Sequence, residues 1–508
     1  MYLNMTDTEF EELKNSAFYE NDLYIKGVHM DFVIDKDNVY SFSSIKISIG
    51  GQHTKTVRKP GYNIKIKDKN KSLLGRDNIR LRSDMRDASM MRTKLTCDLL
   101  NHLGLPSISA NYCHLYINGE FMGLYIIQDI YKPSWIKSYY ENIVSSNIVL
   151  YQCKGIGSDM TNNNLKTCIN LSESASYDPL KSFIMSIKDA KSRKDVESFM
   201  DVDEFIKIWI IEWLIGSWDH MLQSGKNYYL YLQNNGKWQI LIYDFDSTFG
   251  QFLPEDYILP EDDGVLKKER EAIDIEKKDT YIDINDQWIE WLYEKRDSLS
   301  IVIGPYMNET SSLYDFTDWY VNRTIVDALV KNDSESFLKN LQEIIDNGFN
   351  PKLLFPRIDK LREWLDPYIK EDRTEINGQL PGRINVQGKG LDFTYEDFKV
   401  SDYTTVNSGV GIKKWIKDRY DFVCQRYNIT CSNDSNYFLN DIPNNNDPFE
   451  NDNLNSTNNN YGYFEDDNLN STTNNNDSFE DNNLDSTKNN VTPDNKKSDI
   501  IEQFNSTS

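Results

Sequence analysis

The composition of the chain changes abruptly after Cys431. Beyond it, large apolar residues are rare, and a unit centred on Phe449, Phe464 and Phe479 repeats every 15 residues. A unit with one Phe and one Leu cannot bury enough surface to offset its ordering entropy. We therefore expect residues 432–508 to be a disordered acidic tail of Asn, Ser and Thr repeats, a linker or a stalk. The alternative is a repeat solenoid, whose units usually run to roughly 20–50 residues.

The rest of the chain is predicted to be an N-terminal segment, residues 1–21, and one folded unit, residues 22–431. Alternating apolar and polar residues, and the turn signal Asn118-Gly119, predict strands at Ser44–Ser48, Tyr62–Lys67, Asn78–Arg82, His114–Ile117, Phe121–Ile127, Tyr228–Leu232 and Trp238–Tyr243. Helical spacing predicts helices at Met90–Leu103, Val202–Ile215, Ser334–Ile345, Pro356–Trp364 and Gly411–Arg426. A β-rich part up to about residue 130 followed by an α-rich part is typical of a two-lobed α+β fold.

Charge and hydropathy exclude several classes of function. The chain has 80 acidic and 56 basic residues, a formal charge of −24, which argues against a nucleic-acid partner because phosphates require a basic surface. No apolar run reaches the ~18 residues of a membrane span. Met1–Leu13 contains four acidic residues and no apolar core, so we expect no signal peptide here. The protein is then cytoplasmic, or its true N-terminus lies upstream.

Cysteines and glycosylation motifs favour the outside of the cell. Of six cysteines, Cys153 with Cys168 and Cys424 with Cys431 would each close a short disulfide loop. The alternative is a set of small buried thiols in a reducing compartment. Asn-x-Ser/Thr motifs recur, as expected of a secreted glycoprotein, although many arise by chance in so Asn-rich a chain.

The residues between Trp213 and Gly250 give the strongest chemical signal. An apolar helix ends near Gly216, Asp219 follows in a loop, and Asn227 begins a strand. The next strand ends in Asp244-Phe245-Asp246, whose two carboxylates lie on one face. Carboxylate and amide oxygens suit Mg²⁺ in phosphoryl transfer, and a separate Asp can accept the proton of an incoming hydroxyl. The plainer alternative is a strand end followed by an N-cap or turn.

The order of these motifs resembles the CotH family, the atypical protein kinases first known from bacterial spore coats and also found in fungi. Matching stretches include Lys59-Pro-Gly-Tyr62, Arg80-Leu-Arg82, Asp87-Ala-Ser89-Met-Met-Arg92, Leu103-Gly-Leu-Pro106, Tyr116-Ile-Asn-Gly119, Gly123-Leu-Tyr125, Asp219, Asn227, Trp238, Asp244-Phe-Asp246-Ser-Thr-Phe-Gly250 and the closing Trp415, Arg419 and Phe422. Together they cover most of residues 22–431.

The resemblance implies a role for each matching residue in binding ATP and Mg²⁺. Asp219 matches the catalytic Asp, while Asp244 and Asn227 match the metal-binding positions. Asp246 either holds a second ion or caps the following turn.

Nucleotide contacts are also implied by the resemblance. Trp238 matches an aromatic residue that packs on the adenine face, and Lys59 lies where the family has a basic residue near the phosphates, with Lys65 as the competitor. Asp129 takes the place of a family Glu, one methylene longer, that would pair with a lysine.

Two functions remain open at this point. The first is a kinase that transfers the ATP γ-phosphate to Ser or Thr of secreted or coat proteins. The second is a non-catalytic, adhesin-like module at a cell surface, with a cell-wall, coat or host-surface partner. The intact set of Asp219, Asn227 and Asp244 favours the kinase, and the repeat tail favours display outside the cell or on a spore coat.

Overall fold

The computed structural model describes residues 1–431 except 19–22, 52–56, 84, 141–147, 156, 173–175, 252, 254–308, 322, 332, 389 and 391. The expected tail, residues 432–508, lies outside the described residues. Internal contacts group Met1–Cys431 into one unit, and all that follows concerns this unit.

Seven strands of the first part close into a barrel in the order β1-β2-β3-β4-β5-β7-β6. Neighbours are antiparallel except for β1 and β6, which are parallel and close the barrel. The core of the barrel is aliphatic, with Ile45, Ile47 and Leu81 fully buried. The strands are β1 (Tyr2–Asn4), β2 (Ile25–Val33), β3 (Val39–Gly50), β4 (Gly61–Ile66), β5 (Asn78–Arg82), β6 (Ala110–Ile117) and β7 (Glu120–Asp129).

The first residues of the chain are part of this barrel, although the sequence sets residues 1–21 apart. Leu3 on β1 is fully buried, and the N-terminal ammonium of Met1 donates to the carbonyl of His114 at 2.8 Å. The following helix α1 (Asp7–Phe18) contributes Phe10 and Leu13 to the barrel core. A strand of three residues is too short to show alternation, so only its pairing with β2 and β6 reveals it.

The hairpin between β6 and β7 confirms its predicted turn. Asn118 and Gly119 both have positive φ, 51° and 82°, as a type I′ turn requires. The strands predicted near β3, β4, β5, β10 and β11 are likewise confirmed within a few residues.

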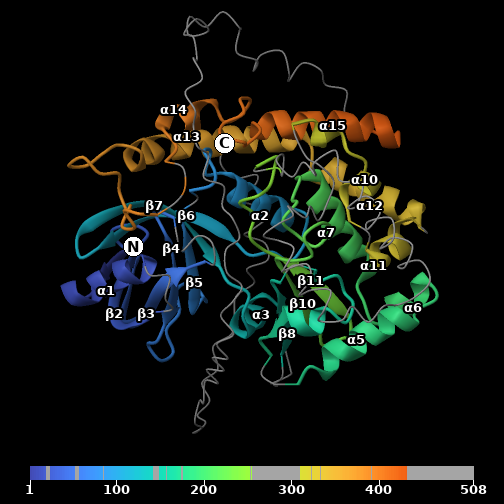
Figure 1. Ribbon diagram of the computed structural model, residues 1–508, viewed down its shortest axis with the longest axis horizontal. Coiled ribbons are helices and arrows are strands. Elements are labelled where there is room, and N and C mark those ends of the chain that lie inside the picture. Colours follow the sequence, from blue (N-terminus) through green and yellow to red (C-terminus); the bar gives the residue numbers. More distant parts are fainter. Residues whose placement is uncertain are drawn as a thin grey trace, which may run out of the picture. The chain divides into compact units, whose positions relative to one another are not determined.

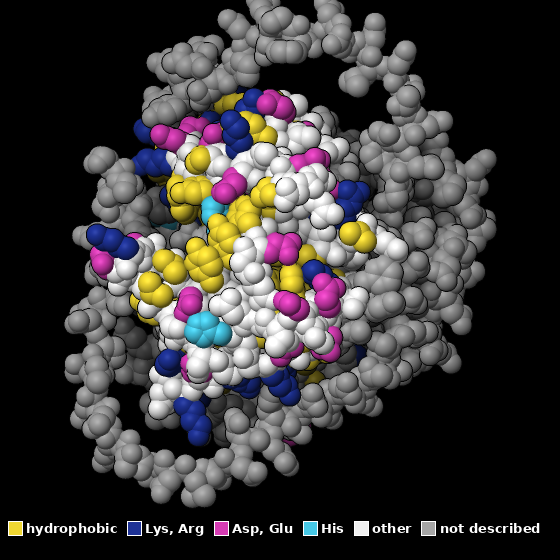
Figure 2. All heavy atoms as spheres, turned by 90° about the vertical axis from the view of Figure 1, so that its left-hand side faces the viewer, with side chains coloured by type: hydrophobic (Ala, Val, Ile, Leu, Met, Phe, Trp, Pro, Cys, Tyr) yellow, Lys and Arg dark blue, Asp and Glu magenta, His cyan; other side chains and the backbone are white. Residues whose placement is uncertain are grey.

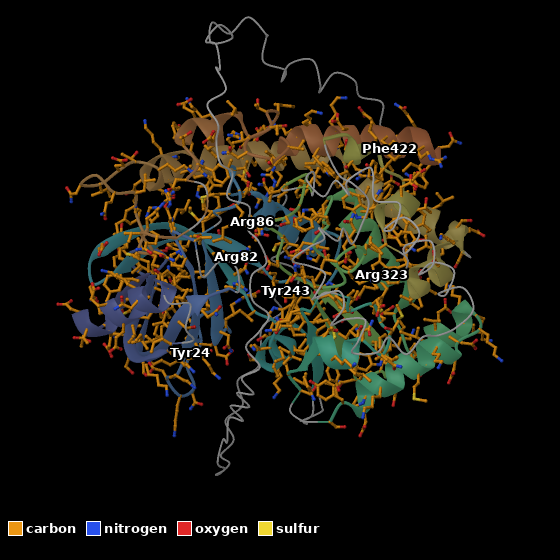
Figure 3. The ribbon with its side chains drawn as sticks, viewed as in Figure 1. Tyr24, Arg82, Arg86, Tyr243, Arg323 and Phe422 are labelled. Atoms are coloured by element: carbon orange, nitrogen blue, oxygen red, sulfur yellow. A yellow bond between two sulfur atoms is a disulfide. The ribbon has the colours of Figure 1, made fainter. Side chains whose placement is uncertain are left out.

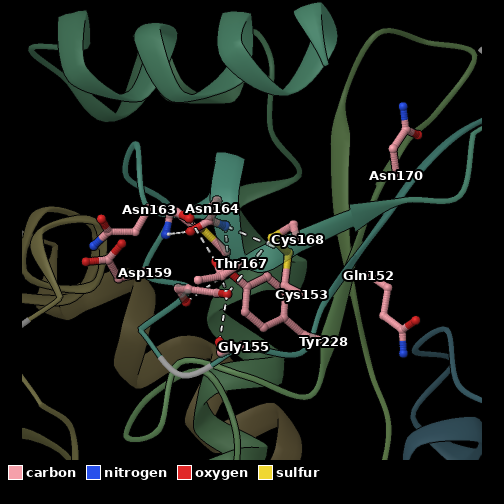
Figure 4. The surroundings of a disulfide bond; sticks show 12 residues. Gln152, Cys153, Gly155, Asp159, Asn163, Asn164, Thr167, Cys168, Asn170 and Tyr228 are labelled. Atoms are coloured by element: carbon pink, nitrogen blue, oxygen red, sulfur yellow. Dashed lines mark hydrogen bonds between the residues drawn. A yellow bond between two sulfur atoms is a disulfide. The ribbon is translucent and has the colours of Figure 1, made fainter. Parts of the chain in front are cut away.

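A second sheet has the order β11-β10-β8-β9. Its strands are β8 (Val149–Cys153), β9 (Cys168–Asn170), β10 (Tyr228–Leu232) and β11 (Trp238–Ile242). Cys153 lies directly opposite Cys168, and a disulfide joins them (Figure 4). Cys424 and Cys431 form the second disulfide, so both expected pairs are bonded, while Cys97 and Cys113 are free thiols.

Helices dominate the rest of the described chain, which makes the fold a mixed α+β one (Figure 1). They are α2 (Arg92–His102), α3 (Pro133–Tyr139), α4 (Asn164–Thr167), α5 (Asp178–Asp189), α6 (Arg193–Glu197), α7 (Val202–Leu214), η2 (Glu309–Leu313), α10 (Phe316–Trp319), α11 (Thr324–Val326), η3 (Asp327–Lys331), α12 (Ser334–Asn347), α13 (Pro351–Asp372), α14 (Tyr395–Val400) and α15 (Ile412–Tyr427). Helix α7 packs on β11, and α13 contacts both β7 and α15.

Helix α13 is much longer than the sequence predicts. The prediction begins it at Pro356 because proline interrupts helices. In the structure Asn350 caps the helix by accepting from the backbone N–H of Lys352, and Pro356 and Pro367 lie inside it. The length matters because Asp372, at its last turn, reaches the barrel.

An exposed series of aromatic rings crosses β1, β6 and α13. Tyr2 stacks on Tyr116 at 4.8 Å between ring centroids, and Phe121 and His114 continue the contacts to Tyr368 on α13. Figure 2 views this side of the barrel and shows hydrophobic side chains gathered in a band. Within the part of the chain that is described, no helix is long and apolar enough to cross a membrane.

Candidate functional site

The loop between α7 and β10, residues 216–227, carries the predicted catalytic Asp219. It leaves α7 at Gly216, whose φ is +62°; a Cβ there would lie 2.2 Å from the ring of Trp415. The indole N–H of Trp415 in turn donates to the carbonyl of Leu214 at 3.0 Å. The start of this 216–227 loop is therefore fixed by close packing against α15.

Two buried charged residues hold the middle of the 216–227 loop. Glu212 on α7 accepts from the backbone N–H of Leu222 at 3.0 Å. Arg323, labelled in Figure 3, donates to the carbonyl of Met221 at 3.1 Å and to that of Gln223. Burial raises the pKa of Glu212 to about 8, because its charged form is poorly solvated.

Asp219 and Asn227 meet across the 216–227 loop. The side-chain amide of Asn227 donates to Oδ2 of Asp219 at 3.0 Å and to its carbonyl at 2.8 Å. The ammonium of Lys226 lies 2.9 Å from Oδ1 of Asp219. Asn227 adopts a positive φ of 61°, a conformation that Asn tolerates better than most residues. Both oxygens of the Asp219 carboxylate are thus oriented by their neighbours.

Asp244 and Asp246 are bridged by one guanidinium from the barrel. Arg82 at the end of β5 donates to Oδ1 of Asp244 at 2.6 Å and to Oδ2 of Asp246 at 2.5 Å. Burial alone would raise the pKa of Asp244, but the charges of Arg82 and Arg80 outweigh it and lower that pKa to about 2. Asp244 is therefore anionic throughout the physiological range, and its φ of 74° lies in the left-handed region.

His220 connects the two groups of carboxylates. One ring nitrogen contacts the carbonyl of Tyr243 at 2.8 Å, and the other lies 2.5 Å from the hydroxyl of Ser217. Burial lowers the pKa of His220, while the negative charges of Asp219, Asp244 and Asp246 act in the opposite direction. The backbone N–H of Tyr243 also donates to the carbonyl of Asn227 at 3.1 Å, so the end of the 216–227 loop and the start of the Asp244–Asp246 segment meet beside His220.

A small pocket opens beside Arg82 on the barrel side of the carboxylates. Arg80 and Arg82 share the outer face of β5, because Ile79 and Leu81 point into the barrel core. The pocket is lined mainly by Gly50, Gly61, Arg80, Arg82, Arg86 and Asp246. Arg82 and Arg86 are labelled in Figure 3.

Lys59 does not reach this pocket. Its side chain is fully buried, and the ammonium donates to Oδ1 of Asp372 at 2.5 Å and to the carbonyl of Leu124 at 2.9 Å. The ammonium also lies 4.6 Å from the ring centroid of Tyr125. Lys65, the competing lysine, lies on β4 opposite Lys46 on β3.

Trp238, expected to cover adenine, lies at the far end of β11 from Asp244. It is 4% exposed, and its ring packs on Phe183 at 4.8 Å and on Tyr151. Strand β11 ends at Ile242, and the six residues from Trp238 to Asp244 span at most roughly 20 Å. The structure does not bring this ring to the carboxylates, because the hydrophobic contacts of the second sheet enclose it.

Asp129 has a partner other than a lysine. Its Oδ1 accepts from Arg76 at 2.6 Å, and its Oδ2 accepts from the backbone N–H of Ser109 at 2.9 Å. It therefore fastens the end of β7 to the loop before β6. The carboxylate that faces Lys59 comes instead from Asp372, which follows Lys59 by 313 residues.

Sequence reasoning missed Arg82, His220 and Lys226 as site residues. Arg80 and Arg82 alternate with buried aliphatic residues, which marks them as outward-facing, but only the barrel's position against β11 shows what they face. His220 follows Asp219 in the sequence and Lys226 precedes Asn227. Their positions next to predicted site residues could have indicated that they belong to the site.

The carboxylates of this site suit Mg²⁺ when a phosphate supplies further oxygen ligands. Within the described residues, no group of three or more His, Cys, Asp or Glu could hold a metal ion by itself. Mg²⁺ in phosphoryl transfer needs only one or two carboxylates, with phosphate oxygens and water completing its shell. Asp244 remains charged, uses only Oδ1 for Arg82, and leaves 26% of its side chain exposed. These residues fit a magnesium ion that arrives with a phosphate.

The chain is similar to known proteins over the residues that contain this site. The family model described as CotH kinase protein matches residues 47–423. Spore coat protein homolog 1 of Rhizopus delemar is 24% identical over 360 residues, covering 68% of this chain and 51% of the relative. Invasin CotH3 of the same fungus is 24% identical over 423 residues, covering 78% and 62%. This chain thus spans about half to three fifths of the length of these relatives.

One solved structure is also similar at a low level. The Helicobacter pylori proinflammatory kinase CtkA covers 74% of this chain and 94% of its own, with 14% identity and a TM-score of 0.27. A TM-score this low carries no argument about fold or function. The family model, in contrast, spans most of the chain and includes every residue around His220. The resemblance seen in the sequence is confirmed, and the chain belongs to the CotH kinase protein family.

Proposed function

We propose that this CotH family member is an ATP-dependent protein kinase that phosphorylates Ser or Thr hydroxyls. The observation that carries the proposal is the meeting of two segments: Asn227 holds Asp219 by a hydrogen bond, and the backbone N–H of Tyr243, next to Asp244, donates to the carbonyl of Asn227 at 3.1 Å. The barrel and the α-rich part act as two lobes, with the nucleotide held where β5 meets the end of β11.

Asp219 is the proton acceptor in this proposal. Lys226 and Asn227 hold its carboxylate in one orientation, so it can accept the hydroxyl proton as the oxygen attacks the γ-phosphorus. The bond from the γ-phosphorus to the β,γ-bridging oxygen breaks, and ADP leaves with that electron pair.

Asp244, with Asn227 and Asp246 nearby, would hold Mg²⁺. The ion supplies charge neutralisation for the phosphates when bound. The residues of the chain do the rest: Arg82 keeps both strand-end carboxylates on one side, and Glu212 and Arg323 keep Asp219 in place.

Labelled ATP, Mg²⁺ and a Ser/Thr peptide library test this proposal with two matched substitutions. Asp219→Asn keeps the shape of the side chain but accepts no proton, so ATP still binds while transfer falls by about 10²–10⁴-fold. Asp244→Asn removes the anionic ligand, so Mg²⁺-dependent ATP binding is lost as well. Asp189→Asn, an exposed site on α5, is the control. Undiminished transfer by Asp219→Asn would refute the kinase assignment.

We further propose that the protein acts outside the cell or on a spore coat. The two disulfides and the relative named for spore coats support this location. A second candidate function is an adhesin-like binding module, favoured by the relative named an invasin and by the exposed aromatic series around His114. A wild-type protein that binds no ATP would favour this second function.

A further inference from the structure

Among the described residues, one arginine of the pocket pairs directly with no carboxylate. Within the described part of the chain, the guanidinium of Arg80 makes no hydrogen bond or ion pair. By contrast, Arg82 holds Asp244 and Asp246, and Lys226 holds Asp219. Arg80 is partly buried between these groups and the pocket.

The surroundings of Arg80 make this lack of a partner costly. Arg80 is partly buried, so its guanidinium loses part of its hydration. Burial and the neighbouring charge of Arg82 both lower the pKa of Arg80, and only Asp244 among the carboxylates counteracts them appreciably. An arginine that served stability alone would be expected to pair with a carboxylate.

The shape of the pocket also suits an anion. Gly50 and Gly61 face each other across β3 and β4, so one wall is backbone without side chains. Arg80, Arg82 and Arg86 add positive charge to the lining, which also includes Asp246. A tetrahedral phosphate matches the fork of a guanidinium, which offers two parallel N–H donors.

We propose that Arg80, together with Arg82 and Arg86, forms the subsite that holds a phosphate group of the nucleotide. This inference rests on the proposed function, and it moves the phosphate contact from Lys59, which is committed to Asp372, to the outer face of β5. A phosphate group held here would lie beside Asp246, which lines the pocket, and near Arg82, which pairs with Asp244; these two carboxylates would hold a Mg²⁺ that arrives with the phosphate.

Binding of pyrophosphate tests the subsite without requiring catalysis. Titration calorimetry on the full chain, with EDTA present, measures the affinity that the protein's own cations provide. We expect Arg80→Ala to weaken pyrophosphate binding by about tenfold or more, because a hydrogen-bonded charge contact is lost. ATP should displace the bound pyrophosphate.

Two further variants make the result interpretable. Arg80→Gln keeps most of the side chain's volume and removes only the charge, so it should weaken binding similarly even if Arg80→Ala unfolds. Arg58→Ala removes an arginine that is 46% exposed and pairs with Asp392 outside the pocket, so affinity should stay within about twofold.

The outcomes separate this inference from the proposed function. Unchanged pyrophosphate affinity in Arg80→Gln, no binding by the wild type, or bound pyrophosphate that ATP does not displace would each overturn the subsite. Phosphoryl transfer that survives Arg80→Gln undiminished would overturn it while leaving the kinase proposal intact. Arg80-dependent binding displaced by ATP, in a protein without transferase activity, would support the subsite and refute the kinase.

Discussion

Lys59 and Asp372 form a buried ion pair between the barrel and the end of α13, with Nζ 2.5 Å from Oδ1. The backbone N–H of Leu124 donates to the same oxygen at 2.7 Å. Arg383 lies 3.7 Å from the other oxygen. The pair therefore fastens the β3–β4 connection and β7 to the longest described helix.

Lys59→Met should destabilise the protein strongly. Asp372 would remain buried next to apolar atoms without its closest partner, and breaking a buried pair on one side costs about 3–5 kcal/mol. Urea unfolding measures this cost. Lys71→Met is the control, because Lys71 is half exposed and pairs with Asp68 at 3.4 Å, which predicts a loss below about 1 kcal/mol. Equal losses in the two variants would show that the buried pair has no special role.

Glu212→Gln should change how stability depends on pH. The folded-state pKa is about 8, against 4.5 for the ordinary carboxyl, so between these values the folded protein holds a proton that the unfolded chain releases. Wild-type stability therefore falls as pH rises from 4.5 to 8, by up to about 1.4 kcal/mol per pH unit from this group. Gln does not titrate, so the variant lacks this contribution.

Unfolding free energies of wild type and Glu212→Gln at pH 5 and pH 8 check this prediction. The variant should gain relative to the wild type at pH 8. Glu343→Gln, at an exposed side chain paired with Lys207, should follow the wild type at both pH values. Parallel curves for the wild type and Glu212→Gln would contradict the buried, protonated state of Glu212.

Trp238→Ala should reduce stability and leave ATP affinity unchanged in the protein that remains folded. Removing a buried Trp leaves a cavity between Phe183 and Tyr151 at a cost of about 3–5 kcal/mol. Calorimetric ATP binding beside thermal unfolding distinguishes this role from adenine stacking. A large loss of ATP affinity in a variant of normal stability would restore the stacking role.

Replacing the first disulfide by Cys153→Ala with Cys168→Ala should destabilise the second sheet. The bond closes a loop of 15 residues, for which chain entropy predicts a loss of about 3 kcal/mol. The Cys424–Cys431 bond closes a shorter loop of 7, so its removal should cost less. Urea unfolding of the two double variants compares them directly, and a larger loss from the shorter loop would contradict this ranking.

Local sequence signals predicted the elements and the site residues that are close in the chain. Alternation and helical spacing found β3, β5, α2, α7 and the β6–β7 turn, because these depend on neighbours a few residues away. Asp219, Asn227, Asp244 and Asp246 were found for the same reason, since 28 residues contain them all.

Contacts between distant residues had no comparable signal. Trp238 has the large flat ring that stacking on adenine requires, yet the second sheet buries it. Lys59 matched a phosphate-binding position, but its partner Asp372 lies at the end of α13, beyond the predicted helix Pro356–Trp364.

By itself the sequence determined the boundary after Cys431, the α+β class, the family and the acidic residues of the site. Only the tertiary structure decided that Met1–Phe18 belongs to the barrel and that Arg80 and Arg82 face the carboxylates. The physical reason is that hydrophobic periodicity specifies which face of a strand is buried, whereas the partner of the opposite face is set by which distant segment, here Asp244–Asp246, folds against it. The role of a charged residue on that face therefore depends on whether the tertiary structure places an opposite charge or a pocket beside it.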